Sequence, residues 1–156
     1  MNAPLYNPRI LRLAADIPHH RRLPAPDASA ERRSPACGSR VAVDVALGPD
    51  GRVAALGQEV RACALGQASA ALMGAGAVGS TPAELATARD ALRGFLVGER
   101  DGPGDWAGLD VLVPVRAHPG RHASVLLPWE AAAEAAERAE RVREPTPGSP
   151  SLAGRG

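Results

Sequence analysis

Two cysteines, Cys37 and Cys63, are the only thiols in this 156-residue chain, and they lie at similar distances on either side of one tight turn. The turn is Gly48-Pro49-Asp50-Gly51, and such residues are typical of a reversal between two strands. Symmetrical pairing about it sets Cys37 opposite Cys63, to within one residue of register. Opposed residues on antiparallel strands have Cβ atoms roughly 5 Å apart, which suits a shared metal ion, a shared cluster or a disulfide.

The surroundings of both cysteines favour thiolate chemistry. Cys63 precedes a run of small apolar residues with helical spacing, so it would lie at a helix N-terminus, where the helix dipole favours negative charge. Arg61 adds a positive charge two residues away. Cys37 stands beside Gly38, which lets the backbone approach a bound ion closely. An inert, buried cysteine is the alternative at either position, because free cysteines are among the most buried residues.

Two thiolates do not complete a tetrahedral metal site, so a further donor is needed. His122 is the leading candidate, because it stands just before the last predicted helix and could reach back over the end of the sheet. A solvent-exposed histidine at a helix entrance is the alternative. The other histidines are weaker candidates, since His118 precedes Pro119-Gly120 in a turn and His19-His20 lies in a connector rich in arginine and proline.

Composition argues against several classes of function. All 18 basic residues are arginine, 17 acids nearly cancel them, and the net charge of +1 provides no basic field for nucleic acid. Two Trp, one Tyr and one Phe offer few stacking surfaces for single strands. No Ser-His-Asp order, paired acids or phosphate loop supports a conventional enzyme, so we expect a protein that is not an enzyme.

The pattern of apolar residues argues against a membrane protein. The N-terminus has no charged segment followed by an apolar run, and no stretch of about 18 apolar residues occurs. We therefore expect a soluble cytoplasmic protein with no membrane partner. Adjacent cysteines in a reducing cytosol more often bind metal or act as thiolates than form a structural disulfide, so a disulfide is the less favoured interpretation.

The chain is predicted to form one α+β domain over residues 1–144, followed by a disordered tail over 145–156 that is rich in Pro, Gly and Ser. A small three-stranded antiparallel sheet with one covered face is expected. Its edge strand and two hairpin arms are predicted over Ser29–Ser34, Arg40–Leu47 and Val53–Val60. The helices that pack on it are predicted to begin at Asn7-Pro8, Ala64, Thr81-Pro82 and Leu126.

Four segments occur in an order that is typical of one known family. They are Leu5-Tyr6-Asn7-Pro8, Pro35-Ala36-Cys37-Gly38, Cys63 at the start of a helix that carries Ser69, and Leu126-Leu127-Pro128-Trp129. In these segments the chain resembles the NifU-like N-terminal domain family, which includes iron–sulfur cluster assembly scaffolds of the IscU and SufU types. The resemblance spans about Leu5–Arg143 and implies an α+β fold, in agreement with the independent prediction. It also implies a site of three cysteines and one aspartate, in which Cys37 and Cys63 match the first two cysteines.

Two positions depart from the family pattern. The family's aspartate falls on Ser39, and its third cysteine falls on Ser124, or on Ala123 if the alignment slips by one residue. A serine hydroxyl is a poor substitute for a thiolate toward iron or zinc. The ligand set expected for this chain is therefore Cys37, Cys63 and, from its position alone, His122.

The resemblance predicts a scaffold or carrier that binds iron and a transient [2Fe-2S] cluster. A cysteine desulfurase would supply the sulfur, and acceptor apoproteins would receive the cluster. A dimer interface or an external thiol could complete the ligand set, so a homodimer is a candidate form. Two alternatives stay open. One is a zinc-binding sulfur-relay protein of the SufU or SufE type in which Cys63 accepts a persulfide sulfur, and the other is a non-catalytic regulatory homologue that binds assembly factors.

Overall fold

A three-stranded antiparallel sheet forms one layer of the protein. The computed structural model describes residues 5–35 and 38–143. The strands β1 (Ala28–Arg33), β2 (Arg40–Leu47) and β3 (Val53–Arg61) lie in the order β1-β2-β3. The three predicted strands and the predicted sheet are therefore confirmed to within one residue at each strand end.

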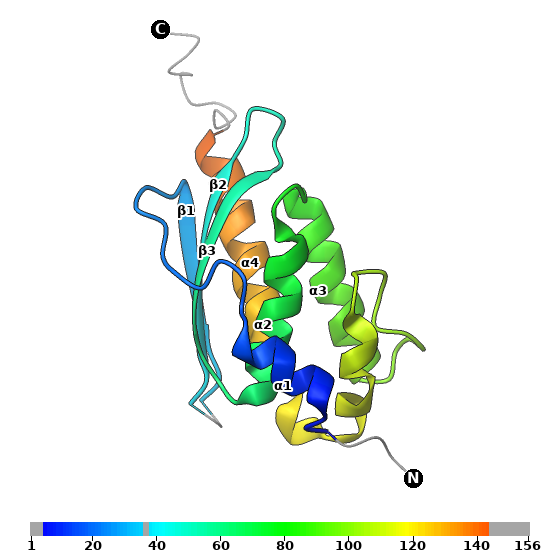
Figure 1. Ribbon diagram of the computed structural model, residues 1–156. Coiled ribbons are helices and arrows are strands. Elements are labelled where there is room, and N and C mark those ends of the chain that lie inside the picture. Colours follow the sequence, from blue (N-terminus) through cyan, green and yellow to red (C-terminus); the bar gives the residue numbers. More distant parts are fainter. Residues whose placement is uncertain (1–4, 36–37, 144–156) are drawn as a thin grey trace, which may run out of the picture.

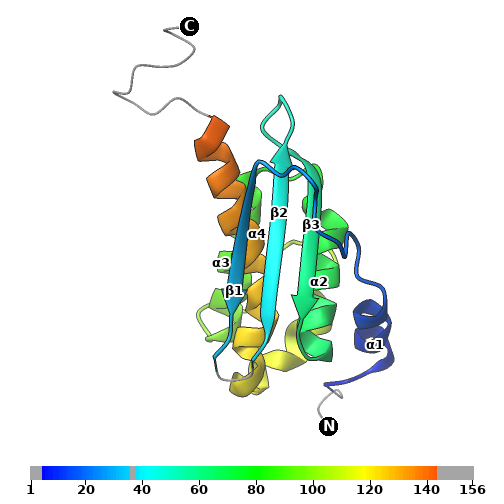
Figure 2. The same cartoon turned by 90° about the vertical axis from the view of Figure 1, so that its left-hand side faces the viewer.

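Helices form the second layer and cover one face of the sheet (Figures 1 and 2). The helices are α1 Pro8–Ala15, α2 Ala64–Ala77, α3 Pro82–Leu96 and α4 His122–Arg143, and two 3-10 helices, η1 Leu109–Ala117 and η2 Pro119–Arg121, lead into α4. Helix α4 packs on β1 and β2, and α2 packs beside β3 and on α4. Helix α3 packs on the far side of α4, and α1 packs on α2. The predicted α+β class is confirmed.

The β2–β3 hairpin follows its predicted turn but not a symmetrical register. Gly51 has a φ of +80°, a left-handed conformation that glycine adopts without strain. A β-bulge opposite Ala46 and Leu47 leaves Ala54 without a direct partner. Beyond the bulge, the register runs from the pair Ala46–Ala55 to the pair Arg40–Arg61. The bulge shifts the pairing by one residue from the symmetrical expectation.

The outer face of the sheet is more covered than predicted. Asp44 points away from the helices, yet its side chain is only 1% exposed because the connector between α1 and β1 crosses over it. The Nε and Nη2 atoms of Arg22 each donate to the carboxylate at 2.8 Å, and the Leu23 N–H and the Ser29 hydroxyl also donate to it. Burial alone would raise the pKa of Asp44, but these hydrogen bonds and the positive charge outweigh it and lower the pKa.

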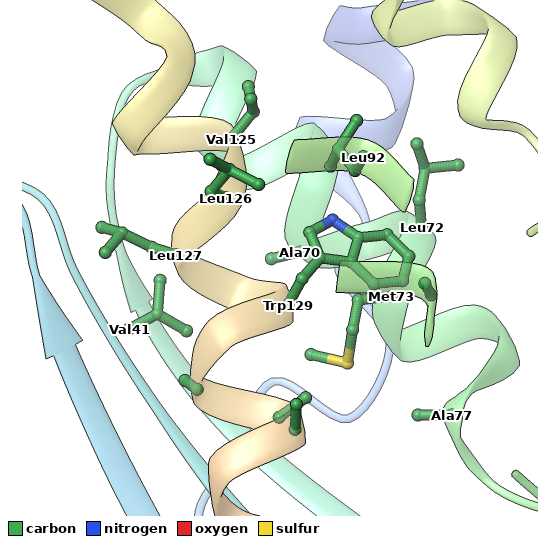
Figure 3. Close-up of a cluster of buried hydrophobic side chains, with 14 of the residues drawn as sticks. Val41, Ala70, Leu72, Met73, Ala77, Leu92, Val125, Leu126, Leu127 and Trp129 are labelled. Atoms are coloured by element: carbon green, nitrogen blue, oxygen red, sulfur yellow. The ribbon is translucent and has the colours of Figure 1, made fainter. Parts of the chain in front are cut away.

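The core rests on small and aliphatic residues around one aromatic ring. Trp129 of α4 is fully buried, and Figure 3 shows it beside Met73 and Ala70 of α2. Its Nε1 donates to the Ser69 hydroxyl at 2.8 Å, and Trp106 meets its ring edge-on with centroids 4.9 Å apart. The small residues of α2 therefore allow α4 to pack closely against it.

Helix boundaries agree with local signals, with one exception. Thr81 and Glu84 form the predicted capping box at the start of α3. Helix α4, however, begins at His122, four residues before the predicted start at Leu126. Pro128 lies inside the helix and leaves the Ser124 carbonyl without its usual helical donor.

Two further predictions concern the C-terminal tail and the lack of membrane-spanning segments. The predicted tail over residues 145–156 lies outside the described residues. Among the helices that the structure describes, none has the length and apolar character needed to cross a bilayer.

Candidate functional site

Cys63 lies at the N-cap of α2, at the end of the molecule where β2 and α4 also begin (Figures 1 and 2). Its thiol is free and partly exposed. The sulfur lies 3.3 Å from the hydroxyl oxygen of Ser124 in the first turn of α4. The predicted placement of Cys63 at a helix N-terminus is thus confirmed, and the thiol is within hydrogen-bond distance of a hydroxyl group.

Ser124 links Cys63 to the start of β2. Its side chain is buried, and its Oγ lies 3.4 Å from the Oγ of Ser39, which is also buried. Three side chains from three separate segments, Ser39, Cys63 and Ser124, therefore form one continuous contact. We call these three residues the Ser39–Ser124–Cys63 cluster.

The geometry distinguishes the two alignments that the sequence allows at the start of α4. Ser124 faces Cys63, whereas Ala123 is exposed to solvent. This contact favours Ser124 over Ala123 as the match to the family's third cysteine, and that match stays a prediction. Ser39, the predicted match to the family's aspartate, belongs to the same cluster.

Two residues of α2 hold the start of α4 in place. Gly66 leaves room for Ser124, because a Cβ at position 66 would lie 2.7 Å from the Ser124 Oγ. The Ser69 hydroxyl donates to the carbonyl of Val125 at 2.6 Å and accepts the Trp129 N–H. Sequence reasoning did not single out Gly66, although a glycine inside a helix lowers helix stability and so signals a close approach.

His122 is directed toward η1. Its Nε2 lies 3.1 Å from the carbonyl oxygens of both Val115 and Arg116, and because carbonyl oxygens only accept, Nε2 carries the proton. Within residues 5–35 and 38–143, no hydrogen bond joins His122 to Cys63 or Ser124. Its Nδ1 is the nitrogen that could bind a metal, and the role of His122 as a ligand stays a prediction.

Cys37 lies outside the described residues, so its predicted contact with Cys63 stays a prediction. The loop on either side of it is closed by two hydrogen bonds, from the Gly38 N–H to the Ser34 carbonyl and from the Ser34 N–H to the Ser39 carbonyl, both at 2.9 Å. Continued past Arg40–Arg61, the hairpin register would set Cys63 opposite Gly38, one residue from the predicted partner.

The described residues do not form a complete metal site by themselves. No group of three or more His, Cys, Asp or Glu side chains converges within residues 5–35 and 38–143. The Ser39–Ser124–Cys63 cluster offers one thiol and two neutral hydroxyls, whereas iron and zinc sites in proteins are built from thiolate, imidazole and carboxylate. The predicted cofactors, a [2Fe-2S] cluster or zinc, would therefore need Cys37 or a donor from another molecule.

Comparison with known proteins identifies relatives among solved structures. No family model matches the sequence, and no curated protein matches it significantly. A nitrogen-fixing NifU-like protein (N-terminal) from Brucella abortus is 39% identical, with a TM-score of 0.83 over 88% of this chain and 95% of the other. A protein assigned as an iron–sulfur cluster assembly scaffold of the SUF system from Fervidobacterium islandicum is 20% identical, with a TM-score of 0.75 over 85% and 96% of the two chains, and shows a shared fold.

Proposed function

The chain belongs to the NifU-like N-terminal family, and from this premise we propose that it is a scaffold or carrier for iron–sulfur cluster assembly. Cys37 and Cys63 bind the cluster as thiolates, and His122 is a further ligand through Nδ1. A cysteine desulfurase supplies sulfur, and acceptor apoproteins receive the cluster in the cytoplasm. The protein is not an enzyme in this role, because the cluster is its cargo.

One observation carries this proposal. The Ser39–Ser124–Cys63 cluster brings together, at one end of the fold, one position that keeps the family's cysteine and the two positions where its other ligands are replaced. The fold holds these three positions together, and Cys63 keeps a thiol among them. Neutral hydroxyls bind iron weakly, so such a site would hold its cargo loosely and release it readily.

The first experiment is an analysis of iron and acid-labile sulfide in protein purified without oxygen. Iron and sulfide in near-equal amounts, lost in Cys63→Ser, are the expected result. Ser80→Ala is the matched control, because its hydroxyl caps the far end of α2. Zinc without sulfide would favour the sulfur-relay function, and an empty protein after anaerobic reconstitution would contradict the scaffold function and favour a regulatory homologue.

A second candidate function is sulfur relay, which the partial exposure of Cys63 supports. In this reaction the Cys63 thiolate attacks the outer sulfur of a desulfurase persulfide. A new S–S bond forms on Cys63, and the desulfurase cysteine leaves as a thiolate. Mass spectrometry after incubation with a cysteine desulfurase and cysteine should then show one added sulfur atom on Cys63, and an unchanged mass would contradict the relay.

A further inference from the structure

Three arginines lie side by side across the sheet at the end that holds Cys63. Arg33 of β1 pairs directly with Arg40 of β2, and Arg40 pairs with Arg61 of β3. Directly paired residues point to the same face, so the three side chains form a row on the outer face, away from α4. Like charges directly opposite each other destabilise a sheet, which makes this Arg33–Arg40–Arg61 row costly unless an anion binds it.

Little in the described protein neutralises the row. Arg33 pairs with Glu31 at 2.8 Å, but neither Arg40 nor Arg61 has an ion pair with any acidic residue of the described ranges. All three arginines line one open hollow of about 310 Å³. Two of the three guanidinium groups are therefore available to a ligand in that hollow.

The hollow adjoins the Ser39–Ser124–Cys63 cluster. Ser39 lines it, precedes Arg40 in the chain, and contacts Ser124 through its side chain. Arg61 lies two residues before Cys63, a separation of at most about 7 Å along the chain. The row and Cys63 therefore lie at the same end of the sheet, and a ligand held by the row on the outer face would have to extend past that end to meet the sulfur of Cys63.

The Ser39–Ser124–Cys63 cluster supplies one thiol and two neutral hydroxyls, and Glu31 offsets only part of the positive charge of the row. A small thiol that carries carboxylates would supply a sulfur donor to the cluster and negative charge to the row. We propose that the Arg33–Arg40–Arg61 row binds the carboxylates of such a thiol and thereby presents its sulfur beside Cys63 as an additional ligand. The second half of this inference rests on the proposed scaffold function, whereas the binding of the thiol does not.

The chemistry of the two partners is complementary. Guanidinium groups bind carboxylates through paired, charge-assisted hydrogen bonds. The outer arginines stand two strand spacings apart, about 10 Å, so a thiol with two carboxylates can contact more than one of them. When its sulfur binds iron, the thiol proton passes to water, and no oxidant or reductant is required.

Reduced glutathione is a suitable probe, because it carries one thiol and two carboxylates. Calorimetric titration of the metal-free protein should show saturable one-to-one binding that weakens as salt rises. S-methylglutathione should bind equally, since its carboxylates are unchanged, and 2-mercaptoethanol should not bind. Binding of sulfate as tight as that of glutathione would overturn the proposal, and so would tighter binding of a polyglutamate peptide, which would indicate an acidic protein segment as the partner.

Single substitutions test the row itself. Arg61→Gln and Arg40→Gln should each weaken glutathione binding by about tenfold, since a charged hydrogen bond is lost. Both variants should fold, because each removes one charge from a like-charged row. Arg141→Gln, an exposed arginine in the last turn of α4, is the matched control and should bind normally. Equal binding by all three variants would refute the assignment of the row.

The same samples separate this inference from the scaffold function. Glutathione should raise the iron and sulfide retained after anaerobic reconstitution of the wild type but not of Arg61→Gln, and S-methylglutathione should have no such effect. Glutathione binding without any retained iron would refute the scaffold function alone. Retained iron that depends on Cys63 but not on glutathione would refute the proposed thiol ligand alone.

Discussion

Gly66 of α2 and Ser124 of α4 are in such close approach that no side chain fits between them. A Cβ on residue 66 would lie 2.7 Å from the Ser124 Oγ and 2.7 Å from the Cβ of Ala62. The contact between Ser124 and Cys63 therefore depends on a glycine in the first turn of α2. A methyl group added at position 66 would therefore disturb the site, although position 66 provides no ligand to a metal.

Gly66→Ala should destabilise the protein and disturb the site. Overpacking of a tight contact costs about 1–3 kcal/mol, which exceeds the helix propensity gained from alanine, about 0.5–1 kcal/mol. Denaturant unfolding should show the lower free energy of unfolding, and retained iron should fall. Gly120→Ala is the control, because a Cβ there meets nothing within 4 Å. Equal stability of the two variants would contradict the close approach.

Ser124→Cys should strengthen metal binding, because it places a second thiol beside Cys63. A change in a group that only supports a ligand alters metal affinity by about 10–100-fold, so replacing a hydroxyl donor by a thiolate should slow iron loss to a chelator by at least about tenfold. Ala123→Cys adds the same thiol one residue earlier at an exposed position. Equal retention by both variants would show that Ser124 does not face the cargo.

Asp44→Asn should destabilise the protein in a pH-dependent manner. Removing the buried carboxylate takes away the closer of the two acidic partners of Arg22, since Glu59 lies 3.8 Å from it, at a cost of about 2–4 kcal/mol at neutral pH. The pKa of Asp44 in the folded protein lies below its usual value of 3.8, so this stabilisation is fully present above about pH 4 and is lost as the pH falls through the folded pKa.

The difference in unfolding free energy between wild type and Asp44→Asn should therefore be constant above pH 5 and shrink below about pH 4. Denaturant titrations at several pH values measure it. Asp110→Asn is the control, because hydrogen bonding to Arg9 also lowers the pKa of Asp110 but both side chains are more than half exposed. A large effect of Asp110→Asn, or a pH-independent effect of Asp44→Asn, would contradict this account.

Ser69→Ala should loosen the junction between α2 and α4. The substitution leaves the buried Trp129 N–H without an acceptor and the Val125 carbonyl without this donor, at a cost of about 2–3 kcal/mol. Thermal unfolding and tryptophan fluorescence should both report the change. Ser80→Ala removes an exposed hydroxyl bond to Gly76 and should change the unfolding free energy by less than about 0.5 kcal/mol.

Local sequence signals predicted the elements that surround the site. The turn residues around Gly51 define the hairpin, and the capping box at Thr81 marks the start of α3, because each acts on backbone groups within a few residues. The same local reasoning placed Cys63 at a helix N-terminus. It failed at the start of α4, where packing against α2 holds a helix that continues past Pro128.

The sequence by itself therefore determined the fold class, the order of the elements and the position of Cys63. Only the tertiary structure decided that Ser124 and not Ala123 meets Cys63, and that Arg33, Arg40 and Arg61 form one row. The first depends on the approach of two helices distant in sequence, and the second on a bulge at Ala54 that shifts the hairpin by one residue. Such contacts join residues far apart in the chain, so their geometry is set by packing of the whole domain and not by local propensity.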